Sequence, residues 1–104
     1  MSQEEKLPKI LIVEDDERLA RLTQEYLIRN GLEVGVETDG NRAIRRIISE
    51  QPDLVVLDVM LPGADGLTVC REVRPHYHQP MLYYAVLTRR LRMKWRSVSS
   101  LMIS

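Results

Sequence analysis

Two short apolar runs stand out along the chain, and each ends abruptly in acid. The first, ILIV at residues 10–13, is followed by three acids at residues 14–16. The second, LVVL at residues 54–57, is followed by Asp58. Unbroken runs rich in β-branched residues are typical of strands buried on both faces of a parallel sheet. The pattern therefore predicts two central strands whose carboxyl ends carry carboxylates.

Apolar residues recur at helical spacing in three further segments. The first predicted helix covers residues 17–30, with Asp16 suited to the N-cap and Asn30-Gly31 to the C-terminal stop. A second helix lies between Asp39-Gly40 and Pro52. A third, short one follows Gly66 and ends before Pro75, with Cys70 and Val73 facing inward.

The remaining segments complete an alternating order. Residues 32–37 alternate apolar and polar side chains, which favours a strand with one polar face at a sheet edge. Residues 76–80, HYHQP, indicate a loop whose His76 and His78 lie at the surface, since no third metal ligand accompanies them. Residues 81–87, MLYYAVL, form a fourth apolar run. The order β-α-β-α-β-α predicts an α/β fold with a right-handed, doubly wound parallel sheet.

Composition adds a boundary near the C-terminus. The 104 residues suffice for one domain, with 44% apolar and 29% charged residues. The net charge of zero combines a net −5 over residues 1–88 with a net +5 over residues 89–104, which contain no acid. The lone Cys70 excludes an internal disulfide and a cysteine-based metal site. Without an apolar segment near the start or a membrane-length apolar run, we expect a cytoplasmic protein.

The acids that end the two central strands predict a reactive site. If these strands are neighbours, the carboxylates of Glu14, Asp15 and Asp58 converge, and their mutual repulsion favours a hard divalent cation such as Mg²⁺. A metal beside Asp58 would allow this carboxylate to act as a nucleophile toward a phosphoryl group. The alternative is that these acids only cap helices and solvate strand ends, which is the interpretation we favour for Asp16.

The same segments resemble a known family. ILIVEDD at residues 10–16, DLVVLDVMLPGADG at residues 53–66 and the 43-residue spacing from Asp15 to Asp58 resemble the receiver domain of bacterial two-component response regulators. MLPGADG is most similar to the OmpR/PhoB-type transcription factors, including RstA-like proteins. The resemblance covers roughly residues 7–80. It implies a flavodoxin-like (CheY-like) fold with sheet order 2-1-3-4-5, which puts the alternating strand at an edge.

The resemblance also implies roles for individual residues. Asp58 resembles the phosphoacceptor, phosphorylated by a sensor histidine kinase in an Mg²⁺-dependent reaction. Asp58 and Asp15 would bind the metal directly, Glu14 would act through water, and Met60 would offer its backbone carbonyl. Such a chain is not an enzyme on a separate substrate, although receivers catalyse their own phosphoryl transfer and hydrolysis. A DNA-binding output domain normally follows in this family, and we expect none within these 104 residues.

The family pattern breaks off toward the C-terminus. A Thr or Ser is expected at the end of the fourth strand, but Ala85 stands there and Thr88 comes three places late. The expected Lys would lie beyond Ser104. No acidic fourth helix, fifth strand or fifth helix is recognisable, so we predict a sheet of order 2-1-3-4 that is incomplete at its C-terminal edge, without the family's dimer face and with impaired output. Residues 1–88 would form a partial receiver domain, and residues 89–104 a basic tail outside the pattern.

The tail admits three interpretations. Its apolar residues fall at helical spacing opposite the bases, which describes a basic amphipathic helix for an anionic membrane or an acidic partner; these residues are Leu91, Trp95, Val98 and Met102. A nucleic-acid-binding tail is the second. The third, which we favour, is out-of-frame sequence after an insertion or deletion, because it explains the loss of acids, the offset Thr and the early end together.

Two other functions remain open on the sequence. The chain could bind a kinase through the intact first helix, residues 17–30, and compete for it without being phosphorylated. It could also be an Mg²⁺ phosphohydrolase of the haloacid dehalogenase type. That class requires a second Asp two residues after the nucleophile, and here the position is Met60.

Overall fold

The computed structural model describes residues 6–61, 64–84 and 102–103. Strands and helices alternate along most of this chain, as the sequence predicts. The elements are β1 (Lys9–Val13), α1 (Glu17–Arg29), β2 (Glu33–Glu37), α2 (Gly40–Glu50), β3 (Leu54–Asp58), α3 (Gly66–Val73), a 3₁₀ helix (Arg74–His76), β4 (Met81–Tyr84) and β5 (Met102–Ile103).

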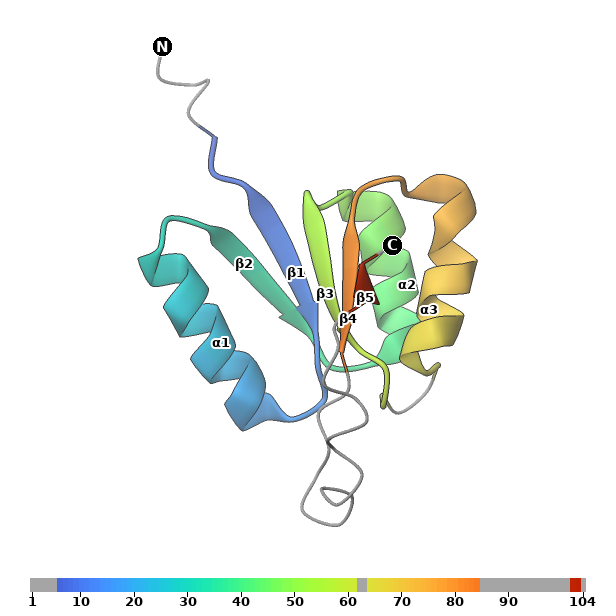
Figure 1. The fold of residues 1–104 in the computed structure, drawn as a ribbon, viewed down its shortest axis with the longest axis horizontal. Helices are drawn as coiled ribbons and strands as arrows, with labels where there is room; N and C mark the ends of the chain where they lie inside the picture. Colours follow the sequence, from blue (N-terminus) through green and yellow to red (C-terminus); the bar gives the residue numbers. More distant parts are fainter. Residues whose placement is uncertain (1–5, 62–63, 85–101, 104) are drawn as a thin grey trace.

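The strands form one sheet in the order β2-β1-β3-β4-β5 (Figure 1). The first four are parallel, and β1 lies between β2 and β3, with Ile12 opposite both Val36 and Val56. This confirms the predicted α/β fold with its parallel order 2-1-3-4. It also confirms the alternating strand, now β2, as an edge strand.

The outer edge of β4 differs from the expectation. We expected no fifth strand, but β5 pairs with β4 in the antiparallel direction, with Leu82 opposite Ile103 and Tyr83 opposite Met102. Met102 is the last apolar position of the proposed amphipathic helix. Because Met102 belongs to β5, the helix does not extend as far as this residue. The rest of the proposed helix, together with Ala85 and Thr88, lies outside the described residues.

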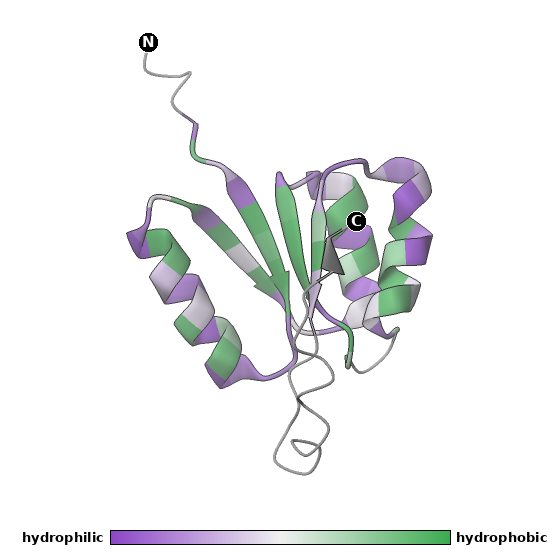
Figure 2. Ribbon diagram, viewed as in Figure 1, coloured by the Kyte–Doolittle hydropathy of each residue, from purple (hydrophilic) through white to green (hydrophobic). Residues whose placement is uncertain are grey.

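Apolar side chains pack on both faces of the sheet, because successive strand residues point to opposite faces. On one face, Leu11, Val55 and Met81 belong to a buried cluster covered by α2 and α3. On the other face, Ile10, Ile12 and Val34 form a smaller cluster with Leu27 of α1. The strands in Figure 2 are accordingly the most hydrophobic part of the ribbon, and polar residues lie on the outer sides of the helices.

Each long helix begins at an aspartate that accepts hydrogen bonds from free backbone N–H groups. The Asp16 carboxylate accepts from the N–H groups of Arg18 and Leu19, both at 3.1 Å. Asp39 and Asp65 cap α2 and α3 in the same way. Asp16 thus has the helix-capping role that we favoured for it.

The polar face predicted for β2 is not a solvent face throughout. Glu37 is only 7% exposed. Its carboxylate accepts hydrogen bonds from the backbone N–H of Asp39 (3.1 Å) and from the guanidinium groups of Arg42 (3.1 Å) and Arg46 (3.4 Å). Burial alone would raise the pKa of the Glu37 carboxyl, but these donors outweigh it and hold the pKa below its ordinary value of 4.5.

Replacing Glu37 should therefore have a pH-dependent effect on stability. A lowered pKa contributes stability that is present above the unfolded-state value, near 4.5, and is lost as the pH falls through the folded-state value. We expect Glu37→Gln to reduce the free energy of unfolding at neutral pH by about 2 kcal/mol, and the difference from the wild type to shrink in acid. Urea melts across this pH range would measure it.

Glu50→Gln is the matched control, because the Glu50 carboxylate also bonds Arg46, at 2.9 Å, but lies at the surface. Its cost should stay below about 1 kcal/mol. Equal costs for the two variants would contradict a special contribution from the buried carboxylate.

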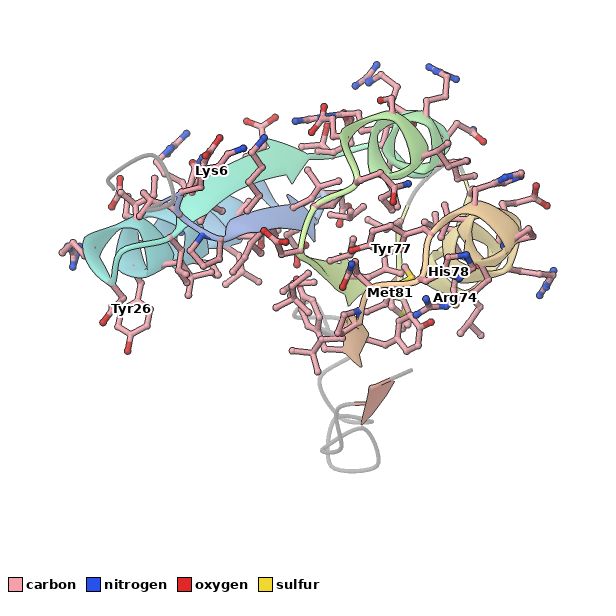
Figure 3. All side chains as sticks on the ribbon, turned by 90° about the horizontal axis from the view of Figure 1, so that it is seen from above. Lys6, Tyr26, Arg74, Tyr77, His78 and Met81 are labelled. Carbon is pink, nitrogen blue, oxygen red and sulfur yellow. The ribbon has the colours of Figure 1, made fainter. Side chains whose placement is uncertain are left out.

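The loop HYHQP contains a buried residue that its polar sequence does not reveal. Tyr77 is fully buried, and its hydroxyl donates a 2.7 Å hydrogen bond to the Pro52 carbonyl. His76 and His78 are exposed, as predicted. In Figure 3, Tyr77 lies inside the molecule whereas Tyr26 points away from it. Tyr77 thereby joins the segment after α3 to the start of β3.

Within the described residues, no helix has the length and apolar character needed to cross a bilayer.

Candidate functional site

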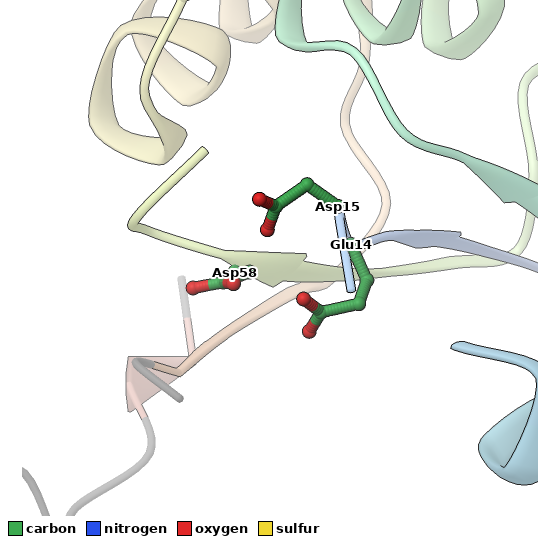
Figure 4. A group of neighbouring side chains, drawn as sticks. All are labelled: Glu14, Asp15 and Asp58. Carbon is green, nitrogen blue, oxygen red and sulfur yellow. The ribbon is translucent and has the colours of Figure 1, made fainter. Parts of the chain in front are cut away.

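Three acidic side chains meet where β1 and β3 end (Figure 4). In the β1–β3 register Val13 lies opposite Leu57, so the next residues, Glu14 and Asp58, are neighbours across the strand pair. One carboxylate oxygen from each of Glu14, Asp15 and Asp58 lies within 4.8 Å of the others. Glu14 is 1% exposed and Asp58 is 2% exposed, whereas Asp15 faces solvent. The structure thus brings together the three acids singled out from the sequence.

Protein donors hold the Glu14 carboxylate on both of its oxygens. Oε2 accepts a 3.0 Å hydrogen bond from the Asp16 backbone N–H. Oε1 accepts a hydrogen bond from the hydroxyl of Tyr84, the last residue of β4. The Glu14 backbone N–H in turn donates to the Glu37 carbonyl at 3.0 Å. Glu14 is therefore fixed by the last residues of β2 and β4 and by the residue that caps α1.

Burial has a strong effect on the ionisation of Glu14. Burial raises the pKa of its carboxyl to about 7; the hydrogen bonds from Tyr84 and Asp16 oppose this shift, and the nearby Asp58 adds to it. Burial and the hydrogen bond to Glu14 also raise the pKa of the Tyr84 hydroxyl far above its ordinary value. The tyrosine therefore stays a hydrogen-bond donor at neutral pH.

Asp58 lies at the point where β3 becomes a tight loop. Its Oδ1 accepts a 2.9 Å hydrogen bond from the Met60 backbone N–H. The Val59 N–H donates to the Tyr84 carbonyl at 2.8 Å, and Gly66 N–H to the Val59 carbonyl at 3.2 Å. A side chain at Gly66 would put its Cβ 2.5 Å from Val59 Cα and 2.8 Å from the Asp58 carbonyl oxygen. The start of α3 thus packs directly on the backbone that carries Asp58.

The chemistry of these side chains fits a magnesium ion. All three offer carboxylate oxygens, which are the ligands that this hard cation prefers. Two of the three acids are buried beside each other, and a divalent cation would relieve the repulsion between their charges. Asp15 is exposed, so a metal held by these acids would be accessible from solvent.

The structure describes only part of the predicted site, and it adds one residue that the sequence does not indicate. Ala85, which stands where the family pattern has a Thr, and Thr88, the nearest Thr, lie outside the described residues, as do Pro62 and Gly63 of the turn. The sequence gives no sign of a role for Tyr84, because in MLYYAVL it reads as one more apolar strand residue. The only signal for it is its position, since the register places Tyr84 opposite Asp58.

Several solved structures are similar to this chain. The receiver domain of Klebsiella pneumoniae RstA, in its BeF₃-activated form, is 40% identical, with a TM-score of 0.72 over 84% of this chain and 74% of that one. The Francisella response regulator 1452 receiver domain is 26% identical (TM-score 0.73; 89% of this chain, 79% of that one). The non-phosphorylated receiver domain of HemR from Leptospira biflexa is also 26% identical (TM-score 0.71; 89% and 77%).

The chain is shorter than its structural relatives, and spans 64 to 79% of the lengths of these three and of a longer fusion protein that also matches. The family model of the response regulator receiver domain matches residues 10–99, which include both acid-terminated strands. The match therefore covers the fold and the acidic site together. This chain belongs to the response regulator receiver domain family.

Proposed function

We propose that this chain is a phosphoacceptor domain in which Asp58 receives a phosphoryl group in a Mg²⁺-dependent reaction. The observation that carries the proposal is the convergence of Glu14, Asp15 and Asp58 within 4.8 Å at the carboxyl end of the sheet. In open α/β sheets this edge is where ligands bind. Two buried carboxylates side by side repel each other when ionised, and a bound divalent cation would relieve that repulsion.

The proposed reaction transfers a phosphoryl group from a histidine to an aspartate. An oxygen of the Asp58 carboxylate forms a bond to phosphorus as the N–P bond of the phosphohistidine breaks, and the freed imidazole takes up a proton. The hydrogen bond from Met60 N–H to Asp58 Oδ1 orients this carboxylate. Mg²⁺ held by Asp15 and Asp58, with Glu14 acting through water, would neutralise charge on the phosphoryl oxygens.

The partner is a sensor histidine kinase, and the setting is the cytoplasm. Helix α1 supports a docking surface for the kinase, because Leu22 and Tyr26 lie one turn apart and are 59% and 62% exposed. The 40% identity with the RstA receiver domain supports the OmpR/PhoB-type branch and a role in transcription control. The same helix supports a second candidate, a kinase competitor that needs no phosphorylation. Kinase binding by both the wild type and an Asp58→Ala variant, with no labelling of the wild type, would favour that candidate.

Acetyl phosphate provides a direct test without the kinase. We expect the wild type, incubated with acetyl phosphate and MgCl₂, to gain the mass of one phosphoryl group, because a small donor can enter the open side of the site beside Asp15. Intact-protein mass spectrometry would measure the gain. Removal of the metal with EDTA should abolish it, since the charge on the phosphoryl oxygens would then be uncompensated. Equal labelling with and without a divalent cation would refute the metal-dependent reaction.

A further inference from the structure

We propose that Tyr84 is a positioning residue of the metal site, whose hydroxyl holds the Glu14 carboxylate in the orientation required for Mg²⁺. The inference rests on the proposed function, because it assigns a role within the same site. It concerns a residue that contributes no acid and no ligand atom to the cluster.

The geometry of Tyr84 carries the inference. Its backbone belongs to β4, which pairs with β3 but not with β1. Its side chain nevertheless reaches Glu14 at the end of β1, so the hydroxyl connects two strands that share no ladder hydrogen bonds. On the way it passes the β3 position opposite it, Asp58. Tyr84 thus spans the two buried acids of the site.

The Glu14 carboxylate has few other means of keeping its orientation. The terminal torsion of a glutamate is broad, so its oxygens are fixed only by the groups that bond them. Here the Asp16 N–H bonds Oε2 and the Tyr84 hydroxyl bonds Oε1, while the Asp58 side chain lies against the same carboxyl group. With the hydroxyl gone, Oε1 loses this donor, and the carboxylate can turn away from the orientation that a cation requires. The loss of orientation weakens the attraction of the site for a cation.

Tyr84→Phe isolates the hydroxyl. The ring stays in place, and the Tyr84 carbonyl still accepts from Val59 N–H, so the β3–β4 connection beside Asp58 is unchanged. Tyr83→Phe is the matched control, because Tyr83 is the preceding residue of β4 and its hydroxyl contacts Cys70 of α3 on the other face of the sheet. The two variants lose the same atom from adjacent positions.

The experiment is a calorimetric titration of the full chain with MgCl₂ alone, without a phosphoryl donor. We expect Tyr84→Phe to bind Mg²⁺ about 10-fold or more weakly, as is usual when a group that orients a metal ligand is removed. Tyr83→Phe should bind like the wild type. At saturating Mg²⁺ the rate of labelling by acetyl phosphate should recover in Tyr84→Phe, because the hydroxyl acts on metal binding and not on the transfer itself.

A double-mutant cycle tests whether Tyr84 acts through Glu14. In a Glu14→Gln background, Tyr84→Phe should cause no further loss of affinity. An equal loss in both backgrounds, wild-type affinity in Tyr84→Phe, or the same loss in Tyr83→Phe would each overturn the inference. Those results leave Mg²⁺ binding by the wild type intact. A wild type that binds no Mg²⁺ would instead overturn the proposed function, and this inference with it.

Discussion

An Asp58→Asn variant is expected to show no labelling above background with acetyl phosphate or a kinase. The amide has nearly the shape of the carboxylate, but its oxygen carries no full negative charge and does not attack phosphorus. Asp58 is 2% exposed and lies at the end of β3, where the Met60 N–H holds its carboxylate. Mass spectrometry of the intact chain and of its phosphorylated peptide would measure the loss.

The loss should not come from unfolding. Removal of one of two adjacent buried charges relieves repulsion, so in metal-free buffer Asp58→Asn should unfold at a urea concentration no lower than the wild type. Asp16→Asn is the matched control: its carboxylate caps α1 and asparagine is an equally good cap, so labelling should persist. Labelling that survives in Asp58→Asn would remove Asp58 from the proposed role.

The second large effect is expected from Gly66→Ala. A Cβ at this position would meet Val59 Cα at 2.5 Å and the Asp58 carbonyl oxygen at 2.8 Å. Both are backbone atoms, which cannot turn aside as a side chain can, so either α3 or the loop after β3 must move. We expect a loss of about 3 kcal/mol in the free energy of unfolding, at the upper end of the usual range for overpacking. That is a large share of the stability of a small domain.

Gly35→Ala provides the comparison for this effect. Its Cβ would meet the end of the Arg46 side chain at 3.1 Å and Leu11 Cδ1 at 3.6 Å, and the guanidinium can shift. The cost in urea melts should therefore be much smaller, and labelling of Asp58 should be retained. If Gly66→Ala were as stable as Gly35→Ala, the close packing of α3 on the site backbone would be disproved.

The central strands and the helix ends could be predicted because their signals are local. A run such as LVVL needs no partner to indicate burial on both faces, and it fixes where Asp58 falls. The glycine after α1 has a φ of 87°, the left-handed conformation that its place after Asn30 suggested. Parallel strands end at the same edge of a sheet, so Glu14 and Asp58 must meet once β1 and β3 are neighbours.

The features that could not be predicted depend on distant partners. Glu37 reads as a solvent-facing residue of an alternating strand, but the Asp39 N–H and the arginines of α2 bond its buried carboxylate. Tyr84 is 70 positions from Glu14, so its hydroxyl has no local sign of a role. The pairing of β5 joins two residues to a strand about 20 positions earlier, and a two-residue strand carries no periodicity that could announce it.

The separation of the two acid-bearing strands has a consequence for the kinetics of unfolding. Asp15 and Asp58 are 43 positions apart in the sequence, and α1, β2 and α2 lie between them. A cation shared by both would close a loop containing these elements, much as a reversible cross-link does. The β1–β3 pair could then separate only after the ion had left. Bound Mg²⁺ should thus lengthen the lifetime of the folded chain against proteases, even where the equilibrium gain is modest.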